Sequence, residues 1–376
     1  MMTPRICLAA ASALALVACT TTPSTPLLAA PVPDQQLTGE AEAGLSRLRA
    51  SDGIPAAGVA VIRCSSQASA VGGERRSDMP GAIASNGYFA IGSNAKSVLA
   101  TAFARLADRG ELSLEQTIGE IWPEAATAHP DKADITFAQL LGHASGLPAF
   151  DTGAELGQLP EMPADIPEAS RAAAQWFLSQ PLVSQPGSET RYSNAGYVIA
   201  GELLARHQGM PFAEVVAREV LAPLGIEGSY GRDQRLDAGD PVGHTAGEDG
   251  AEPYLDPEPP IPAWLQAAGG LSMPIDDYAT YVRAHLCALQ GEGAFLSQEM
   301  AERLHTPLIA DGAALGWGRF ELGGHITSFH IGGTGDFTAY MALQPDRDRA
   351  ALAVVSVGGA PAGEAQSWLV EQMSAP

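Results

Sequence analysis

The pattern of apolar positions divides the chain into two strand-rich ends and a helical centre. On the N-terminal side, leucines at helical spacing predict a helix over 39–50, and the apolar run 58–64 predicts a buried strand with a hairpin partner that reaches about residue 73. Toward the C-terminus the apolar runs predict strands near 325–331, 336–344 and 350–357. A last helix is expected over 365–373. This order predicts an α/β (α+β) fold: an antiparallel sheet built from N- and C-terminal strands and flanked by helices, with a mainly helical region inserted between them.

The central part reads as helices separated by two long irregular stretches. Helical spacing predicts helices over 93–109, 135–141, 171–178, 195–206, 211–221 and 275–289. Residues 151–169 are acidic and punctuated by proline, which predicts a surface loop, and 231–262 form the largest irregular stretch. Because a loop this long in a compact domain is usually functional or disordered, we expect 151–190 and 231–262 to rim a binding pocket.

The N-terminus has the features of an export signal. Arg5 supplies a positive charge, and the apolar segment 8–17 is too short to span a membrane. The tetrapeptide that ends at Cys19 resembles the bacterial lipobox, in which the cysteine is lipidated; an ordinary cleaved signal with an incidental cysteine is the alternative. Residues 20–37 are rich in threonine and proline, which is typical of an extended spacer.

These features predict three parts: a signal peptide over 1–18, the lipidated Cys19 with a flexible linker over 19–38, and one domain over 39–376. Thr20, and not an aspartate, follows the cysteine. By resemblance to Gram-negative lipoproteins, we expect a periplasmic protein held by a lipid anchor in the outer membrane.

Charge and composition exclude several classes of function. A formal net charge of −22 argues against a nucleic-acid partner, because nucleic-acid binding needs a basic face. The sequence contains no P-loop, no dinucleotide-binding glycine fingerprint, no His-Glu-x-x-His and no paired Cys-x-x-Cys, so we expect neither a cofactor nor a metal. No feature points to an oligomeric state. Of the cysteines, Cys64 and Cys287 would remain after export; we expect two buried free thiols, with a disulfide as the alternative that the compartment permits.

One serine and one lysine form the first candidate for chemistry. Ser93 follows a strand-like run that ends at Gly92, and Lys96 lies three residues further on, about one helical turn along the same face. The chain contains 21 Lys and Arg residues together, and lysine occurs only at 96 and 132, so Ser-x-x-Lys occurs once. An arginine bias explains the rarity of lysine, but arginine could not act as a base here, whereas a lysine beside a serine can.

Two downstream motifs could complete the site. Tyr192-x-Asn194 precedes a helix and offers a phenol and an amide; the alternative is a capped helix with Asn194 as its N-cap. The segment from His330 to Gly335 ends a strand with little side-chain bulk, so that a substrate could approach the backbone closely; the alternative is a hairpin turn with an incidental histidine.

In order and spacing, Ser-x-x-Lys, Tyr-x-Asn and His-x-Gly resemble the motifs of the serine β-lactamase and penicillin-binding-protein superfamily. They are most similar to the branch of class C β-lactamases, R61-type D,D-carboxypeptidases and family VIII esterases. The resemblance covers about residues 40–373 and extends to further segments at 140–147, 202–225, 267–271 and 315–318.

The resemblance implies a role for each site residue. Ser93 would attack a carbonyl to form an acyl-enzyme, Lys96 would be the base, and Tyr192 would shuttle the proton. Asn194 would bind the acyl side of the substrate, and the backbone N–H groups of Ser93 and Gly333 would hold the oxyanion. His330, Gly332 and Thr334 would line the substrate-binding strand. We expect a structural role for His143, which lies in the 140–147 segment.

Two departures from the family pattern shape the expected activity. Class C β-lactamases typically carry Lys-Thr-Gly where this chain has His330-Ile331-Gly332, and an imidazole is charged only part of the time near neutral pH. This favours hydrolysis of a small-molecule ester, an amide or a peptidoglycan-like D-amino peptide over efficient β-lactam hydrolysis. Asn94, directly after the nucleophile, is more polar than the usual residue. The alternative function is a catalytically silent penicillin-binding or scaffold lipoprotein with the same fold.

Overall fold

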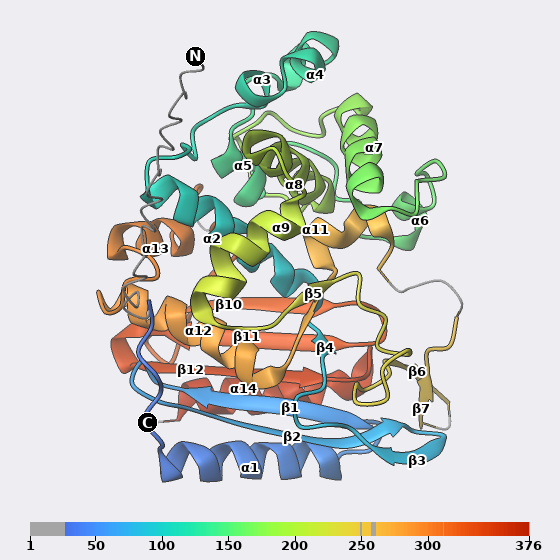
Figure 1. Cartoon of the computed structure of the whole chain (residues 1–376), viewed down its shortest axis with the longest axis vertical. Helices are drawn as coiled ribbons and strands as arrows, with labels where there is room; N and C mark the ends of the chain where they lie inside the picture. The colour runs from blue at the N-terminus through green and yellow to red at the C-terminus, as the bar shows by residue number, and fades with distance from the viewer. Residues whose placement is uncertain (1–26, 249, 257–260, 311, 376) are drawn as a thin grey trace, which may run out of the picture.

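The centre of the fold is a seven-stranded antiparallel sheet, seen edge-on in the lower half of Figure 1, in the order β3-β2-β1-β12-β11-β10-β9. The computed structural model describes residues 27–248, 250–256, 261–310 and 312–375. The strands of this sheet are β1 (Ala56–Ile62), β2 (Gln67–Arg76), β3 (Met79–Ala82), β9 (Gly318–Leu322), β10 (His325–Gly333), β11 (Thr338–Gln344) and β12 (Arg349–Val355). Strands β1 and β12 are neighbours, so the two ends of the chain share one sheet, and the predicted fold is confirmed.

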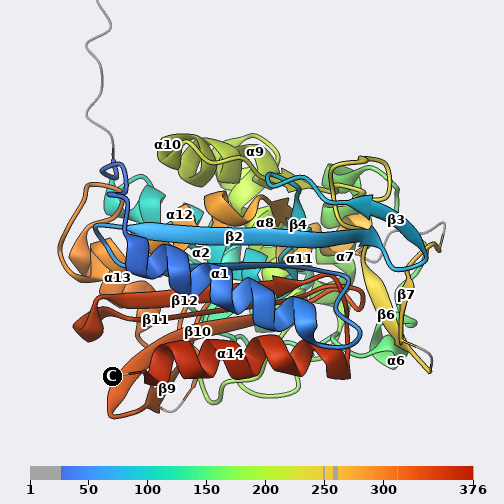
Figure 2. The ribbon, with the colours of Figure 1, turned by 90° about the horizontal axis from the view of Figure 1, so that it is seen from below.

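Two helices, α1 (Gln35–Ala50) and α14 (Gly363–Ser374), cover one face of the sheet, where Figure 2 shows them side by side. They pack so closely that a Cβ on Gly44 would lie 2.6 Å from the indole nitrogen of Trp368. The first and last helices therefore close the same apolar layer against the strands.

The other face of the sheet carries α12 (Ile275–Leu289), α2 (Ala95–Asp108) and the helical region beyond them (Figure 1). The remaining helices are α3 (Ile118–Ile121), α4 (Pro123–Ala128), α5 (Phe137–Leu141), α6 (Gly153–Leu156), α7 (Ile166–Ser179), α8 (Asn194–Gln208), α9 (Phe212–Val216), α10 (Ala222–Leu224), α11 (Gln266–Gly269) and α13 (Gln298–His305). Helix α2 is buried along most of its length, so the main core lies between the sheet and this helical region.

A second, three-stranded sheet links the segment before Ser93 to the end of α11. Its strands are β4 (Phe89–Ala90), β8 (Leu271–Met273) and β5 (Ser229–Tyr230), with β8 in the middle. The backbone N–H of Ile91 donates to the carbonyl of Leu271 (3.1 Å), which fixes the chain just ahead of the candidate nucleophile.

Both predicted loops contain more regular structure than the sequence indicated. The stretch 151–169 contains α6 and the start of α7. Asp165 caps α7 by accepting from the backbone N–H of Glu168 (3.2 Å). The stretch 231–262 contains a hairpin of β6 (His244–Gly247) and β7 (Gly250–Pro253). The prediction of a surface loop over 151–169 was therefore wrong where α6 and α7 lie, and that of an irregular stretch over 231–262 was wrong for the hairpin.

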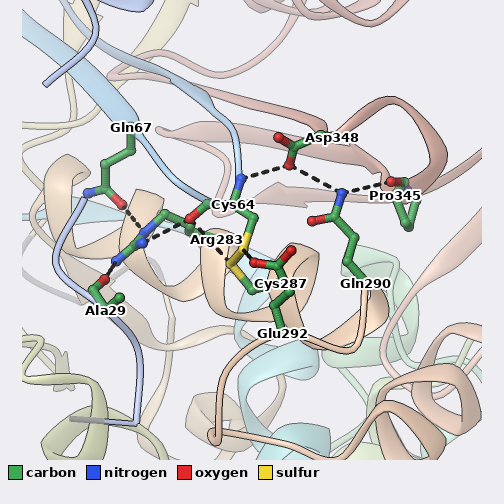
Figure 3. Close-up of a disulfide and its surroundings, with 9 residues drawn as sticks. All are labelled: Ala29, Cys64, Gln67, Arg283, Cys287, Gln290, Glu292, Pro345 and Asp348. Atoms are coloured by element: carbon green, nitrogen blue, oxygen red, sulfur yellow. Dashed lines mark hydrogen bonds between the residues drawn. A yellow bond between two sulfur atoms is a disulfide. The ribbon is translucent and has the colours of Figure 1, made fainter. Parts of the chain in front are cut away.

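The expectation of two free thiols was also wrong, because Cys64 and Cys287 form a disulfide with their Cα atoms 4.9 Å apart (Figure 3). The bond joins the chain just after β1 to helix α12, which pack together. Beside it, the buried guanidinium of Arg283 donates to the carbonyls of Ala29 (2.7 Å) and Cys64 (3.0 Å) and to Oε1 of Gln67 (3.0 Å). The two cysteines come together because β1 packs against α12, and this packing cannot be predicted from the sequence pattern.

Part of the expected flexible linker is bound to the domain. Ala29 is held by Arg283, the backbone N–H of Val32 donates to the carbonyl of Ser65 (2.8 Å), and α1 already begins at Gln35. The predicted leader 1–18 and Cys19 lie outside the described residues. In the described ranges, no helix is both long enough and apolar enough to cross a membrane.

Candidate active site

A tight turn places Ser93 at the entrance of helix α2. Residues Gly92–Asn94 form one 3-10 turn that runs into α2. Gly92 has φ +52°, a backbone conformation that favours glycine, and a Cβ there would lie 2.6 Å from the backbone nitrogen of Gly333. The turn therefore holds Ser93 against the end of strand β10.

Lys96 lies one turn further along, and its amine reaches the serine. The Nζ atom is 3.0 Å from Oγ of Ser93 and donates to the carbonyl of Ala268 (2.7 Å). The side chain is fully buried, and in the described ranges it forms no ion pair. Burial lowers the pKa of Lys96 well below its usual value, opposed in part by the charge of Asp151. Because the charged form is disfavoured, the amine can act as a proton acceptor.

Tyr192 approaches the serine from the other side. Its hydroxyl donates to Oγ of Ser93 (2.7 Å), and its ring lies against that of His143, with a centroid separation of 4.5 Å. Burial raises the pKa of Tyr192 to about 12, although the hydrogen bond with Ser93 lowers it in part. The phenol therefore keeps its proton at neutral pH and is available as a donor.

His143 is buried behind Tyr192 and does not reach the serine through a hydrogen bond. Its Nδ1 accepts from the backbone N–H of Ser193 (3.1 Å), and its carbonyl accepts from that of Arg191 (2.7 Å). Burial lowers the pKa of His143 well below its usual value, so the ring is neutral. These contacts hold the Tyr192 segment in place, which is a structural role.

Asn194 is the first residue of α8, and Ser193 is the N-cap, since Oγ of Ser193 accepts from the backbone N–H of Gly196 (3.1 Å). The alternative of Asn194 as the N-cap is therefore wrong. The Asn194 side chain donates through Nδ2 to the carbonyl of Phe150 (2.8 Å). Its Oδ1 accepts no hydrogen bond from the rest of the described chain, and this leaves it as an acceptor for a substrate.

The end of β10 packs directly against the backbone of the turn that carries Ser93. A Cβ on Gly332 would lie 2.0 Å from the carbonyl oxygen of Ile91 and 3.0 Å from the backbone nitrogen of Ser93. Only glycine fits here, and its absence of bulk brings the next residue, Gly333, beside the turn that carries Ser93.

His330 lies on the same strand but inside the protein. Its Nδ1 is 2.9 Å from the carbonyl oxygen of Ile331. Burial, together with the nearby Lys96, lowers the pKa of His330 to about 3. The expectation of a partly charged imidazole was therefore wrong, because the ring is neutral at physiological pH.

Thr334 is the first residue beyond β10, and its hydroxyl is already engaged. It donates to Oδ1 of Asp336 (2.6 Å) and accepts from the backbone N–H of Phe337 (3.0 Å). Both Thr334 and Asp336 line a cavity of about 180 Å³ that adjoins the site. The sequence singled out Thr334 but missed Asp336, which no motif marks.

Asn94 points away from the site. Its Nδ2 donates to the hydroxyl of Tyr278 on α12 (2.6 Å), deep in the core. This contact explains the polar residue directly after the nucleophile, because the hydrogen bond holds the turn against α12.

The geometry brings Lys96 and Tyr192 together around Oγ of Ser93, and the backbone of Gly333 lies beside Gly92 in the turn that carries this serine. Across the part of the chain that the structure describes, no group of histidine, cysteine, aspartate and glutamate side chains could hold a metal ion.

Comparison with known proteins now places the chain in a family. The family model described as Beta-lactamase matches residues 41–372, and the chain belongs to that family. The family comprises penicillin-binding-protein-like serine hydrolases, and this chain shares their mixed fold with a large antiparallel sheet.

The chain is similar to two curated proteins in sequence and to one solved structure in fold. Penicillin-binding protein 4 of Amycolatopsis lactamdurans is 26% identical over 283 residues, which cover 70% of this chain and 71% of that protein. The D-alanyl-D-alanine-carboxypeptidase/endopeptidase AmpH of Escherichia coli K12 is 22% identical over 290 residues, 71% of this chain and 70% of its own. The structure of EstCE1, a hydrolase with promiscuous acyltransferase activity, superimposes with a TM-score of 0.74 at 18% identity, covering 90% of this chain and 99% of that one. The chain spans 60 to 71% of the length of the first curated relatives.

Proposed function

We propose that this protein is a serine hydrolase that forms an acyl-enzyme at Ser93 and hydrolyses an ester or an amide. The observation that carries the proposal is the position of one oxygen: Oγ of Ser93 lies 3.0 Å from a buried lysine amine and 2.7 Å from a tyrosine hydroxyl. A serine with a base and a proton donor in hydrogen-bond range is the arrangement of an activated nucleophile.

In the first half-reaction, Lys96 accepts the hydroxyl proton while Oγ of Ser93 attacks the substrate carbonyl. The backbone N–H groups of Ser93 and Gly333 stabilise the negative oxygen of the tetrahedral intermediate, and each donor of this kind contributes roughly 3–4 kcal/mol in other hydrolases. The proton then passes through the Tyr192 hydroxyl to the leaving group. In the second half-reaction, a water molecule takes the place of the leaving group, and the same residues release the acid.

Lys96 and not Tyr192 is the base in this proposal. The pKa of Tyr192 is raised to about 12 by burial, whereas the pKa of Lys96 is lowered well below its usual value by the same cause. Burial therefore favours the neutral, proton-accepting form of the amine and the protonated form of the phenol.

The substrate-binding strand favours esters and amides over β-lactams. A β-lactam carries a carboxylate, which is best bound by a fixed positive charge. His330 is neutral and the Thr334 hydroxyl already donates to Asp336, so neither offers that charge or that donor. A D-amino peptide of the kind implied by the name of the AmpH relative, and a small ester, remain the preferred substrate classes.

The N-terminal features complete the proposal. Cleavage before Cys19 and its lipidation would tether the enzyme in the periplasm, at the outer membrane of a Gram-negative bacterium. The test is metabolic labelling with a palmitate analogue, which should be lost on Cys19→Ala; retained labelling would refute the anchor.

A substrate panel tests the catalytic proposal. We expect purified protein to hydrolyse p-nitrophenyl acetate faster than nitrocefin, with D-alanyl-D-alanine peptides as the third arm, and expect Ser93→Ala to be inactive on all three. Comparable turnover of nitrocefin and p-nitrophenyl acetate would contradict the substrate preference. Inactivity of the wild type on every arm would favour the silent penicillin-binding or scaffold lipoprotein.

A further inference from the structure

A cavity lies beside the turn that carries Ser93, and neither Ser93 nor Tyr192 lines it. It has a volume of about 180 Å³, and its wall runs from Gly269 and Gly270 to Thr334, Asp336 and Phe337. A Cβ on Gly269 would lie 3.8 Å from the backbone nitrogen of Ser93, so one wall of the cavity lies next to the turn that carries the nucleophile. Thr334, which follows Gly333 at the end of β10, lines the cavity, and Tyr192, beside which the leaving group must lie, does not. This position suits the acyl side of the substrate, beyond the part that Asn194 would bind.

Asp336 is the carboxylate on the wall of this cavity. It is only 5% exposed, and in the described ranges no lysine, arginine or histidine pairs with it. Thr334 donates to its Oδ1 (2.6 Å), and a Cβ on Gly243 would lie 1.9 Å from its Oδ2. The turn after β10 and the backbone of Gly243 therefore hold the carboxylate in a fixed position.

The positive charges near the cavity are already neutralised. Arg232 on the wall pairs with Asp240 (2.6 Å) and Asp237 (2.9 Å), and the neighbouring Arg235 pairs with Asp233 (2.8 Å). Asp336 therefore forms no ion pair in the described ranges, although the charge of Arg235 acts on it from a distance.

The amide donors on the wall are also engaged. Gln234 donates through Nε2 to Ser272 (2.6 Å), and Gln266 donates through Nε2 to the carbonyl of Ile261 (2.9 Å). The cavity thus presents a carboxylate that forms no ion pair, while both side-chain amides already donate to other parts of the protein. Such a wall is complementary to a cationic donor and repels an anion.

We propose that this cavity binds an acyl group that bears an ammonium, with Asp336 as its counter-ion, so that the enzyme acts on esters or amides of amino acids with a free amino group. The inference rests on the proposed function and narrows its substrate class. An acyl group that carries a carboxylate is a poor substrate, because it would face the same aspartate.

Burial raises the pKa of Asp336 to about 6, chiefly by desolvation, with Arg235 opposing the shift. The carboxylate is consequently ionised above neutral pH, where a substrate amine is still protonated. An ammonium that enters the cavity would form an ion pair with Asp336 and so compensate the carboxylate for the loss of its hydration on folding.

The first test compares matched substrates in matched variants. Alanine p-nitroanilide with a free amine and its N-acetyl derivative, each in D and L form, are assayed with wild type, Asp336→Asn and Asp336→Glu. We expect kcat/KM to favour the free amine by at least about tenfold in the wild type. The ratio should collapse toward one in Asp336→Asn and be partly retained in Asp336→Glu. Because the readout is a ratio within each variant, a general loss of activity cancels.

A second test needs no variant and covers the case in which Asp336→Asn does not fold. Wild-type enzyme is assayed on p-nitroanilides of one length whose terminal group is an ammonium, a trimethylammonium, an acetamide or a carboxylate. The proposal expects both cations to be preferred, less so at high salt, and the carboxylate to be worst. An acetamide or carboxylate that equals the ammonium would overturn it.

The two levels of the proposal fail in different ways. If p-nitrophenyl acetate acylates Ser93 but the cationic substrates show no preference, the amine site is refuted and the hydrolase stands. If no substrate is turned over and Ser93 forms no adduct, both are refuted.

Discussion

The contact between Gly332 and the turn before Ser93 gives a quantitative prediction. A Cβ at Gly332 would lie 2.0 Å from the carbonyl oxygen of Ile91, whereas such contacts essentially never fall below 3.0 Å. Gly332→Ala must therefore move the end of β10 away from the turn by at least about 1 Å. That shift displaces the backbone N–H of Gly333 from the oxyanion.

Loss of one oxyanion donor costs a factor of about 100 to 1,000 in kcat, so we expect kcat/KM of Gly332→Ala on p-nitrophenyl acetate to fall by at least about 100-fold. Overpacking should also lower the free energy of unfolding by about 1–3 kcal/mol. Activity is measured at urea concentrations where the protein is still folded, and urea denaturation of the same samples gives the free energy of unfolding, so the two effects are separated.

The matched control is Gly39→Ala on helix α1, where an added Cβ meets no atom within 4 Å. We expect full activity and a stability gain of about 0.5–1 kcal/mol, because alanine is the better helix former. A Gly332→Ala enzyme with wild-type kcat/KM would refute the assignment of Gly333 to the oxyanion site.

Three further predictions follow from the buried groups. Lys96→Arg keeps the charge but loses the base, so activity on p-nitrophenyl acetate should fall at least about 100-fold. Because burial lowers the pKa of Lys96 well below its usual value, wild-type kcat/KM should reach its plateau at a pH well below the ordinary lysine pKa, and a profile that keeps rising up to that pKa would contradict this. Replacing both Cys64 and Cys287 by alanine removes a crosslink between residues 223 positions apart and should lower the free energy of unfolding by about 2–5 kcal/mol. An unchanged midpoint of urea denaturation would contradict this. Burial raises the pKa of Asp336 from 3.8 to about 6, so ionisation of this carboxyl lowers the free energy of unfolding as pH rises through that window. The free energy of unfolding of Asp336→Asn should therefore exceed that of the wild type by about 1–3 kcal/mol at about pH 8 and show no such gain at about pH 4. Equal gains at both pH values would refute the charge as the cause.

The sequence indicated the chemistry of Ser93 and Lys96 because their relation is local. Residues three apart on a helix are neighbours whatever the rest of the fold does. Tyr192 and Gly333 reached the site only through the resemblance of motif order to a known family. Their approach to Ser93 depends on how α8 and β10 pack, which no spacing within either motif encodes.

The features that the sequence missed are all contacts between distant segments. Asp336 has no motif, and its burial follows from the approach of Gly243. The Cys64–Cys287 bond depends on how β1 meets α12, and the role of Asn94 depends on Tyr278 from that same helix. The neutral state of His330 likewise follows from its burial, whereas its position in the motif suggested exposure to substrate.

The most direct test of the central claim is the mass of the intact protein after reaction with a fluorophosphonate probe. The account predicts one adduct, located on the peptide that contains Ser93, absent in Ser93→Ala and strongly slowed in Lys96→Arg. An adduct that persists in Ser93→Ala, or a wild-type protein that no acylating or phosphonylating probe modifies, would contradict it.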